Sequence, residues 1–384
     1  MKTAAVICEY NPFHYGHKYQ LEQTRAAGAT HIVAVMSGNF TQRGDIAIFD
    51  KYARAKTALE NGVDLVLELP TKYSLSAAES FARGAVGIIG ALGCVDMLSF
   101  GCECGDISAL KEAAGAAEYA VHSEQFAARL KSGKSYPAAL AETVKEFYTD
   151  DVYDILCEPN NTLAVEYLKA LDDIGSEITP LAVMRSGAAH DSSESSGGFA
   201  SASLIREKIL AGENYSQFAP VVDAEYADIT RLETAILAKL RTMRRDDFEN
   251  VYDAAQGLGE RLYKAVRMAG NLNELYFLAK TKRYTLARIR RAVLCSFLGV
   301  DKRQLHCHNA YIRVLGMNSR GREILAAANC TLPIDTSLKS LMKQSREAFK
   351  QGAAEECFGD IYALAFAKPR RCGGEFTAKP VIIE

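Results

Sequence analysis

The sequence predicts an α/β protein in which a doubly wound parallel sheet is followed by a mainly helical second part. Short apolar runs alternate with helical stretches through the first half of the chain. From Asp228 onward, long amphipathic stretches replace this alternation. The chain has 384 residues, a length that fits two domains. We therefore expect one domain over residues 1–215 and a second, helical domain over residues 225–384.

Five apolar runs predict the strands of the sheet. They lie at residues 3–8, 31–36, 63–69, 95–100 and 178–184. The helical segments between them lie at residues 14–27, 51–60, 74–92, 107–145 and 160–171. No tight hairpin turn separates consecutive strands, so we expect right-handed βαβ crossovers and a parallel, Rossmann-like sheet.

The second part begins after a polar connection. Residues 186–203 are small and rich in Ser and Gly, a composition typical of a loop, and we expect a mobile lid there rather than a domain linker. Amphipathic periodicity then predicts helices in four places. These are residues 232–244, 260–268, 272–281 and 286–297.

Composition excludes several classes of protein. The 45 basic and 47 acidic side chains leave a net charge of −2, which excludes a positive charge over the whole surface but not a local basic patch. No run of about 18 apolar residues is present, and the chain reaches Glu9 too early for a signal peptide. We therefore expect a cytoplasmic protein without membrane spans, whose ten cysteines are reduced thiols.

Two segments raise the question of a structural metal. Cys102-x-Cys104 and His306-Cys307-His308 place possible ligands close together, but neither has a second pair at zinc-site spacing. Small, partly buried side chains are the simpler interpretation. We assign no metal-ligating residue.

The strongest functional signal directly follows the first predicted strand. It is the segment Glu9-Tyr10-Asn11-Pro12-Phe13-His14-Tyr15-Gly16-His17, at the carboxyl edge of the sheet, where ligands bind. Pro12 ends the strand, and Gly16 lets a ligand approach the backbone. His14 and His17 are three residues apart, so both side chains point the same way at a helix start that attracts phosphate. The alternative is a pair of helix-capping or core histidines, but the strand and the Asn-Pro-Phe sequence favour a phosphate site.

This segment resembles the His-x-Gly-His signature of the nucleotidyltransferase superfamily, which includes adenylyltransferases and class I aminoacyl-tRNA synthetases. In that superfamily a nucleophile attacks the α-phosphate of ATP, and pyrophosphate leaves. The resemblance implies that His14 and His17 stabilise the phosphates as charge builds up in the transition state, a task of positioning and electrostatics. No Lys-Met-Ser-Lys-Ser signature is present, which argues against a true aminoacyl-tRNA synthetase.

Further motifs narrow the resemblance to the bacterial tRNA(Met) cytidine acetate ligases, over nearly the whole chain. They are MSGNFTQRGD at 36–45, DKYAR at 50–54, ELP at 68–70, FGCECGD at 100–106, PNNTLAVEY at 159–167 and YIRVLG at 311–316. Such enzymes activate acetate with ATP to acetyl-adenylate. They then pass the acetyl group to N4 of the wobble cytidine of elongator tRNA(Met), giving N4-acetylcytidine. The resemblance implies ATP, acetate and this tRNA as partners, with Mg²⁺ held mainly through the phosphates and water.

The resemblance also implies an ATP site made of one continuous segment and a few later positions. The segment is Ile7, Cys8, Glu9, Tyr10, Asn11, Pro12, Phe13, His14, Tyr15, Gly16, His17, Lys18, Tyr19 and Gln20. Gly101, at a strand end, suits contact with adenine or ribose, and Arg185, after the fifth strand, suits bidentate contact with a phosphate. Asn160 or Asn161, at a helix start, offers an amide to the nucleotide or is instead an N-cap.

Two more polar segments are candidates for the same site. Residues 201–206 resemble the Ser-x-x-x-Ile-Arg phosphate motif of the smaller adenylyltransferases, so Ser203 and Arg206 are expected on the β- and γ-phosphates. The alternative is a plain Ser-capped helix. After the second strand, Arg43 would neutralise a phosphate or the tRNA backbone, and Asp45 would order a base or that arginine. The alternative for these two is a salt bridge in a surface loop.

A basic run is the candidate contact for tRNA. Residues 280–291 hold six basic side chains, no acidic one, and Tyr284, which could stack on a base. The six are Lys280, Lys282, Arg283, Arg288, Arg290 and Arg291. Such a run can also be a solvated helix face, but the resemblance favours RNA. Lys368-Pro369-Arg370-Arg371 would extend the patch.

Two other functions remain open. A small-molecule adenylyltransferase of the nicotinate-mononucleotide or phosphopantetheine kind would leave the helical second half unexplained. A catalytically silent RNA-binding module is disfavoured by the intact His14, His17, Ser203 and Arg206.

Overall fold

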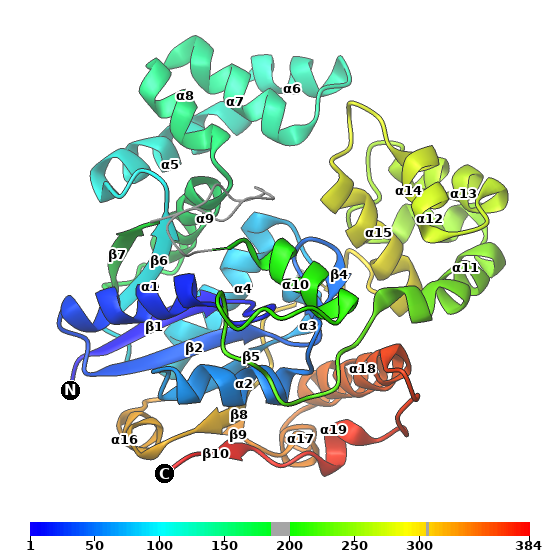
Figure 1. Ribbon diagram of the computed structural model, residues 1–384. Coiled ribbons are helices and arrows are strands. Elements are labelled where there is room, and N and C mark those ends of the chain that lie inside the picture. Colours follow the sequence, from blue (N-terminus) through cyan, green and yellow to red (C-terminus); the bar gives the residue numbers. More distant parts are fainter. Residues whose placement is uncertain (186–199, 305–306) are drawn as a thin grey trace.

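The structure is a computed structural model that describes residues 1–185, 200–304 and 307–384. A central sheet with helices on both faces runs through it (Figure 1). Its strands are β1 (Thr3–Cys8), β2 (His31–Ser37), β5 (Leu65–Leu69), β6 (Met97–Cys102), β7 (Thr179–Met184), β8 (Ile312–Met317), β9 (Ile334–Asp335) and β10 (Val381–Ile382). The order across the sheet is β10-β8-β5-β2-β1-β6-β7, and β9 pairs with β8.

The five strands predicted in the first half are all present and pair in parallel. β1 lies between β2 and β6, so the chain turns to one side of β1 and later returns to the other. Crevices at such a switch point, outside the carboxyl ends of the strands, are where open α/β sheets bind ligands. The segment after β1 begins at that point.

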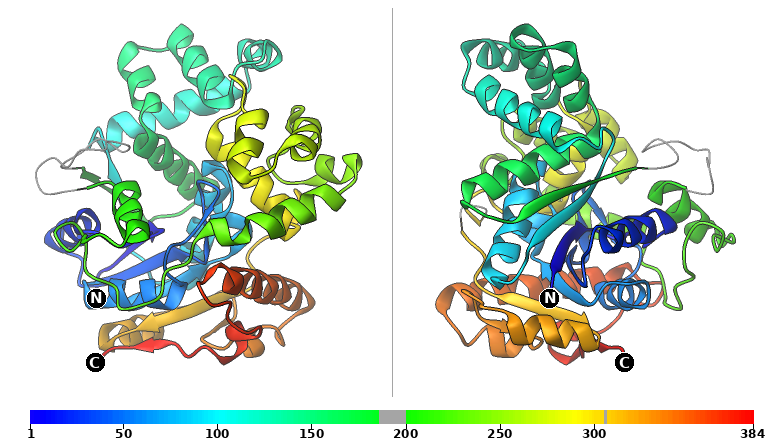
Figure 2. Two further views of the ribbon diagram at one scale, coloured as in Figure 1. Left: turned by 45° about the vertical axis from the view of Figure 1, so that its right-hand side comes forward. Right: turned by 90° about the vertical axis from the view of Figure 1, so that its left-hand side faces the viewer.

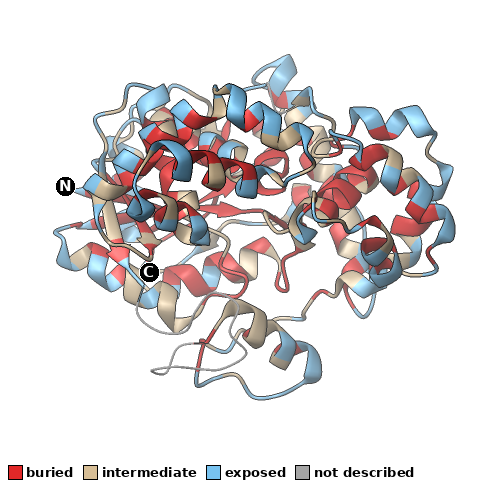
Figure 3. Cartoon of the chain, turned by 90° about the horizontal axis from the view of Figure 1, so that it is seen from above, coloured by how far each residue is buried: buried red, intermediate tan, exposed pale blue. Residues whose placement is uncertain are grey.

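The central strands are apolar on both faces because helices cover each face. Val33 and Val35 belong to a core shared with α4 and α9, whereas Ile32 and Ala34 belong to a core shared with α1 and α2. Figure 3 shows the buried residues gathered along the sheet and the helix faces that lie against it. The helices of the first half are α1 (Tyr15–Ala26), α2 (Lys51–Glu60), α3 (Thr71–Ser74), α4 (Ala78–Leu92), α5 (Ile107–Val121), α6 (Glu124–Lys131), α7 (Tyr136–Phe147), α8 (Asp150–Cys157) and α9 (Pro159–Asp173).

One predicted helical stretch begins later in the structure, and another is divided. The stretch 74–92 corresponds to α4, which begins at Ala78 after the short α3, and the stretch 107–145 becomes α5, α6 and α7. Ser123 and Ser135 cap α6 and α7 with their side chains, and Gly133 takes a positive φ of 95° between those two helices. Side-chain caps and a left-handed glycine end helices that apolar periodicity alone would continue.

The second half is mainly helical, as predicted. After α10 (Ala202–Ala211) come η1 (Ile229–Leu232), α11 (Glu233–Thr242), α12 (Arg245–Asn250), α13 (Leu258–Met268), α14 (Leu272–Ala279) and α15 (Leu286–Leu298). The helices α11–α15 enclose an apolar core of their own. In the left view of Figure 2 they form a group of their own beside the α5–α8 helices.

The expectation that strands disappear after Asp228 is wrong in one respect. β8, β9 and β10 join the sheet of the first half, and β8 runs antiparallel to β5. β8 is buried along its whole length, so it lacks the alternation of a half-exposed strand. The remaining helices are α16 (Ser319–Ala327), α17 (Leu338–Leu341), α18 (Arg346–Tyr362) and α19 (Gly374–Thr377), with η3 (Ala363–Ala365). Residues 225–384 thus share a sheet with residues 1–215, and the domain boundary stays a prediction.

A buried ionic cluster holds the returning segment to the sheet. Lys51 donates from Nζ to Glu68 Oε1 at 2.6 Å and to Glu375 Oε2 at 2.7 Å. Arg313 of β8 pairs with the same two carboxylates. These neighbouring carboxylates raise the pKa of Lys51, so the lysine stays charged although it is buried.

Some expectations fall outside what the structure describes. Of the polar loop at residues 186–203, the structure describes only residues 200–203, and His306 also lies outside the described residues. Within the residues it does describe, no helix is long and apolar enough to cross a membrane.

Candidate nucleotide-binding site

The two histidines lie together at the start of α1. His14 is the N-cap, and its Nδ1 accepts the N–H of Gly16 at 3.1 Å. His17 Nδ1 accepts the N–H of His14 at 3.2 Å, which closes a capping box. The rings stack with centroids 3.6 Å apart and planes 23° apart. The capping role weighed as an alternative is therefore real.

That capping role also prepares the rings for an anion. Because Nδ1 of each ring accepts a backbone N–H, the proton of each neutral imidazole sits on Nε2. Burial lowers the pKa of His17 well below its usual value, and the nearby His14 and Arg185 lower it further. Tyr10 and Phe13 enclose His17, with ring centroids at 4.9 and 5.6 Å. His17 is thus a neutral N–H donor at neutral pH.

The loop before the histidines is held by contacts with the backbone of residues 42 and 48, which follow the strands β3 (Phe40–Thr41) and β4 (Asp45–Ile46). Glu9 Oε1 accepts the N–H of Gln42 at 2.7 Å, and burial raises the pKa of Glu9. Asn11 Oδ1 accepts the N–H of Ile48 at 2.8 Å. Tyr10 is buried with a φ of 47°, and the Asn11–Pro12 peptide bond is cis. The side chains of Glu9 and Asn11 therefore tie the loop to the segment that follows β2.

The start of α10 comes directly to this loop. Arg206 donates from Nη1 to Asn11 O at 2.9 Å and from Nη2 to Ser203 Oγ at 3.2 Å. Ser201, not Ser203, is the N-cap of α10, since its side chain accepts the N–H of Leu204. Ser203 and Arg206 therefore do not serve as the plain cap, and the fold brings them beside the segment that carries His14.

The segment after α10 also packs on this loop. Tyr15 donates from its backbone N–H to Phe218 O at 3.1 Å and from its hydroxyl to Ser216 O at 3.1 Å. Ile205 and Ile209 of α10 share an apolar cluster with Phe49. The chain beyond the first half thus forms one wall around the start of α1.

The ends of β6 and β7 supply the other predicted positions. A Cβ placed on Gly101 would lie 3.6 Å from Arg185 Cγ, so these two residues are neighbours. Arg185 donates from Nη1 to Asn160 Oδ1 at 3.5 Å, and its charge acts on His17. Gly101, Arg185 and Asn160 therefore lie on the same edge as the histidines.

Asn161 has a different position from Asn160. It is buried, and its Oδ1 accepts the N–H groups of Glu103 at 2.8 Å and Cys104 at 3.2 Å. Asn160 instead contacts the Glu103 carboxylate and Arg185. Between the two amides, Asn161 holds the loop after β6, and Asn160 is the one beside Arg185.

The remaining residues of the predicted ATP segment are Ile7, Cys8, Lys18, Tyr19 and Gln20. The first two are half-buried at the end of β1, and burial raises the pKa of the Cys8 thiol. Lys18 is exposed on α1, whereas Gln20 donates from Nε2 to Ser99 O at 3.2 Å. The segment therefore runs from the sheet edge along α1, and Gln20 ties that helix to β6.

The Gln42–Asp45 segment links this site to the helical part. It lies between β3 (Phe40–Thr41) and β4 (Asp45–Ile46), which form an antiparallel pair. A Cβ on Gly44 would come within 2.4 Å of Arg291 N, so the turn packs against the backbone of α15. Burial raises the pKa of Asp45, while Arg206 and Arg290 act in the opposite direction. Asp45 therefore lies between the wall of the nucleotide site and the basic helix.

Two residues of the predicted basic surface have partners inside the fold. Arg291 is 7% exposed, donates from Nε to Asp253 Oδ2 at 2.7 Å, and donates from Nη1 to Gln42 O at 2.9 Å. Arg288 donates to Asp253 O, Gln256 Oε1 and Ala255 O. Both guanidiniums brace α15 internally, and their contact with RNA stays a prediction.

The other basic side chains of the run are divided between internal contacts and solvent. Lys280 donates from Nζ to Tyr284 O at 2.8 Å, and Arg283 donates from Nη2 to Leu130 O at 3.3 Å, which joins this turn to α6. Lys282 is exposed, and Arg290 lies over the ring of Tyr276 with its guanidinium carbon 5.5 Å from the centroid. Lys280 and Lys282 are thus the exposed members of the run, Arg290 is half-buried, and which of the six meet RNA stays a prediction.

The C-terminal basic segment does not extend the patch through Arg370. That side chain pairs with Asp50 at 3.1 Å and with Glu225 at 3.5 Å, and it stacks on Phe366. Its charge is therefore engaged beside α2 and not beside α15.

Sequence reasoning gave no role to Arg54, although it lies within a motif that carried the resemblance. Arg54 is completely buried and donates to carbonyl groups at the ends of β1 and β2. Polar and apolar residues alternate along this helix, and that pattern does not indicate that its arginine is fully buried. The spacing of Arg54 from the Asp50 N-cap does not indicate this burial either.

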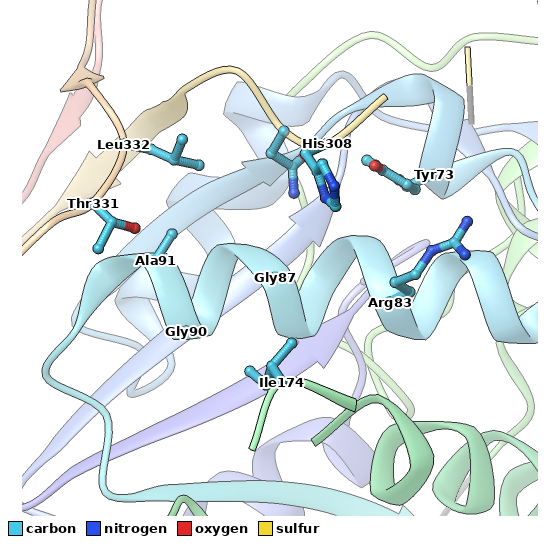
Figure 4. Close-up of a pocket in the computed structure, with 10 residues that line it drawn as sticks. Tyr73, Arg83, Gly87, Gly90, Ala91, Ile174, His308, Thr331 and Leu332 are labelled. Carbon is cyan, nitrogen blue, oxygen red and sulfur yellow. The ribbon is translucent and has the colours of Figure 1, made fainter. Parts of the chain in front are cut away.

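A cavity of about 490 Å³ lies against α4, away from these residues (Figure 4). Tyr73, Arg83, Ile174 and His308 are among the residues that line it. No residue of the predicted ATP or tRNA site does so, and the cavity is therefore not part of the candidate site. Among the residues that the structure describes, no group of three His, Cys, Asp or Glu side chains could hold a metal ion.

The site combines paired N–H donors at a helix start, the switch point of a parallel sheet, and an arginine from a later helix. This combination is that of a nucleotidyltransferase. A family model described as HIGH nucleotidyl transferase matches residues 1–372. The tRNA(Met) cytidine acetate ligase of Fervidobacterium nodosum is 36% identical, over 92% of this chain and 88% of its own. That of Syntrophomonas wolfei is 35% identical over 99% of both chains.

A solved structure gives the same result. The crystal structure of Thermotoga maritima TmcAL bound with alpha-thio ATP matches with a TM-score of 0.90 and 29% identity, over 100% of both chains. The chain belongs to the tRNA(Met) cytidine acetate ligase family of HIGH nucleotidyl transferases, and it is an enzyme of the ligase class.

Proposed function

We propose that this protein uses ATP to activate acetate as acetyl-adenylate and transfers the acetyl group to N4 of the wobble cytidine of elongator tRNA(Met). The names of the relatives support tRNA(Met) and acetate as substrates, and the alpha-thio ATP in the Thermotoga maritima structure supports ATP as the nucleotide. The observation that carries the proposal is the pair of N–H donors at the start of α1, His14 and His17, with Arg206 held on Asn11 of the same loop.

The first half-reaction follows from this geometry. An acetate oxygen attacks the α-phosphorus, the bond to the β-phosphate oxygen breaks, and pyrophosphate leaves with the electron pair. Nε2–H of His14 and His17 would stabilise the negative charge on the phosphate oxygens, while Arg206 and Arg185 would hold the outer phosphates. A neutral His17 suits this task because its Nε2–H can donate a hydrogen bond to a phosphate oxygen.

The second half-reaction is acyl transfer. The cytidine N4 amine attacks the acetyl carbonyl carbon, the bond from that carbon to the AMP phosphate oxygen breaks, and the amine loses a proton. We propose that residues 1–215 carry the nucleotide chemistry and that residues 225–384 present the tRNA, chiefly through Lys282 and Arg290. The turn at Asp45 lies between these two parts.

Mg²⁺ would accompany the triphosphate. The carboxylates nearest the loop, Glu9 and Asp45, each accept a backbone N–H, from Gln42 and Ile46. This fits an ion held mainly through the phosphates and water, where it would offset phosphate charge.

The test is ATP–pyrophosphate exchange with the purified full-length protein and Mg²⁺, with and without acetate and without tRNA. We expect exchange that requires acetate, followed by transfer of labelled acetate to a tRNA(Met) transcript with C34 and not to one with U34. His17→Ala should abolish exchange, and His122→Ala, at the exposed end of α5, is the matched control. Exchange that ignores acetate, or labelling of the U34 transcript, would contradict the proposal.

A further inference from the structure

Arg54 of α2 is among the largest side chains that are fully buried, with an exposed fraction of 0%. A guanidinium removed from water is unfavourable unless its charge and its N–H groups are compensated. The surroundings of Arg54 therefore have to offset that charge, and their composition shows how.

The acceptors around Arg54 are backbone carbonyl groups. Nε donates to Phe49 O at 2.9 Å, and Nη1 donates to Glu9 O at 2.5 Å and to Ser37 O at 3.1 Å. Nη2 donates to Gly38 O. Across the described part of the chain, no carboxylate forms an ion pair with this guanidinium. The N–H groups are satisfied, but the positive charge has no anionic partner in contact.

The acidic groups closest to Arg54 are committed elsewhere. Asp50 caps α2 through the N–H groups of Tyr52 and Ala53, and it also pairs with Arg370. Glu9 turns its carboxylate to Gln42 N. Arg206 adds a further positive charge on the other side of the Glu9–Asn11 segment. Asp50 and Glu9 thus lie near enough to act on Arg54 through space, but neither carboxylate contacts its guanidinium.

The position of the acceptors connects Arg54 to the nucleotide. Glu9 O lies at the start of the loop that carries His14 and His17, and Ser37 O and Gly38 O lie at the end of the adjacent β2. One rigid, planar fork thereby joins the ends of two parallel strands behind the loop. Charge placed there, in a region of low dielectric, acts strongly on an anion in front of the loop.

We infer that Arg54 is a positioning residue for the triphosphate: it fixes the loop of His14 and His17 by its carbonyl contacts, and the phosphates of the bound nucleotide are the counter-charge that its buried guanidinium lacks. The inference rests on the proposed function for the identity of the anion. It adds a residue that acts through the backbone and through its field, without touching the nucleotide.

Two substitutions separate these two actions. Arg54→Lys keeps the charge, but a lysine ammonium group cannot donate to carbonyl groups of three segments at once as the guanidinium does. This variant should therefore change the geometry of the loop and keep the field of the charge. Arg54→Gln keeps a neutral donor and removes the charge. Lys56→Gln removes one positive charge from an exposed position on the same helix and is the matched control.

The experiment is calorimetric binding of adenosine, AMP, ADP and ATP to the full-length protein and its variants, with folding checked by thermal unfolding. In the wild type each added phosphate should tighten binding. In Arg54→Gln we expect the gain from AMP to ATP to fall at least tenfold, while the dissociation constant for adenosine stays within twofold. Arg54→Lys should keep most of that gain but lower the kcat of pyrophosphate exchange at least tenfold, with KM for ATP within threefold.

Several results would overturn the inference. An equal loss for adenosine and ATP in Arg54→Gln would make Arg54 a structural residue only. If Arg54→Gln fails to fold, Arg54→Lys decides, because a kcat within twofold of wild type would exclude positioning. If the wild type gains affinity with each phosphate but shows no acetate-dependent exchange, the proposed substrates fail while the role of Arg54 stands.

Discussion

The loop after β1 and the basic run at the start of α15 differ in how their structure arises. In the loop, the contacts that orient His14 and His17 are made within four residues, by side chains that accept the N–H groups of the same turn. In the basic run, the contacts of Arg288 and Arg291 reach residues that lie far away in sequence. A motif whose geometry is local can be read from the sequence, whereas a count of charges cannot show which way each side chain points.

Arginine is the residue for which a count of charges most easily misleads about the direction of the side chain. Its five donors make it an effective brace between backbone carbonyl groups, as Arg54, Arg288 and Arg291 show. A basic run therefore predicts a polyanion site only where its side chains are not already used inside the fold.

The largest effect that would test this comparison is expected in the loop. His17→Ala removes an N–H donor that we propose for the phosphates and should lower the rate of pyrophosphate exchange by about 10²- to 10³-fold. His17→Asn restores an acceptor for the His14 N–H and should regain the fold of the turn but little of the rate. Exchange within threefold of wild type in His17→Ala would remove the histidine pair from the chemistry.

The next effect concerns stability and separates two adjacent arginines. Arg291→Ala leaves the half-buried Asp253 without its closest partner, and only the longer contact of its carboxylate with Arg288 at 3.5 Å remains, so the variant should lower the free energy of unfolding by about 2 kcal/mol. Arg290→Ala, from a half-buried position over Tyr276, should lower it by less than about 1 kcal/mol. Urea denaturation of both variants measures the difference, and equal losses would show that burial does not distinguish the two.

A smaller effect is expected on tRNA affinity. Lys282→Ala and Arg290→Ala should each weaken binding about five- to tenfold at low salt and reduce the slope of log affinity against log salt by about one. Pyrophosphate exchange without tRNA should stay unchanged in Lys282→Ala. Wild-type affinity for both variants across a salt series would mean that tRNA binds on another surface.

The smallest effect concerns pH: we expect the rate of pyrophosphate exchange not to depend on the titration of His17 near neutral pH. The folded protein holds the pKa of His17 well below 6.5, so the ring is already neutral above that value and loses its neutral form only in acid. Titration of His17 should therefore leave the exchange rate unchanged within about twofold between about pH 6.5 and 8. A rate that rises through a pKa near 6.5 in the wild type but not in His17→Asn would show that His17 titrates with its ordinary pKa.

The sequence alone determined the features that depend on neighbours along the chain. The apolar runs of the five parallel strands, the helix starts at Tyr15 and Lys51, and the turn that pairs His14 with His17 are all set by contacts over a few residues. The position of that turn at a ligand-binding edge followed from the parallel sheet, since all its strands end on the same side.

Only the tertiary structure decided which distant groups meet. It placed β8 antiparallel to β5, brought Arg206 to Asn11, directed Arg291 to Asp253, and enclosed Arg54 among carbonyl groups. The physical reason is that burial of a charged side chain depends on the sum of its contacts with segments far apart in the chain. The pattern of apolar residues determines which face of a helix is buried, but it does not determine which polar atoms of other segments contact that face.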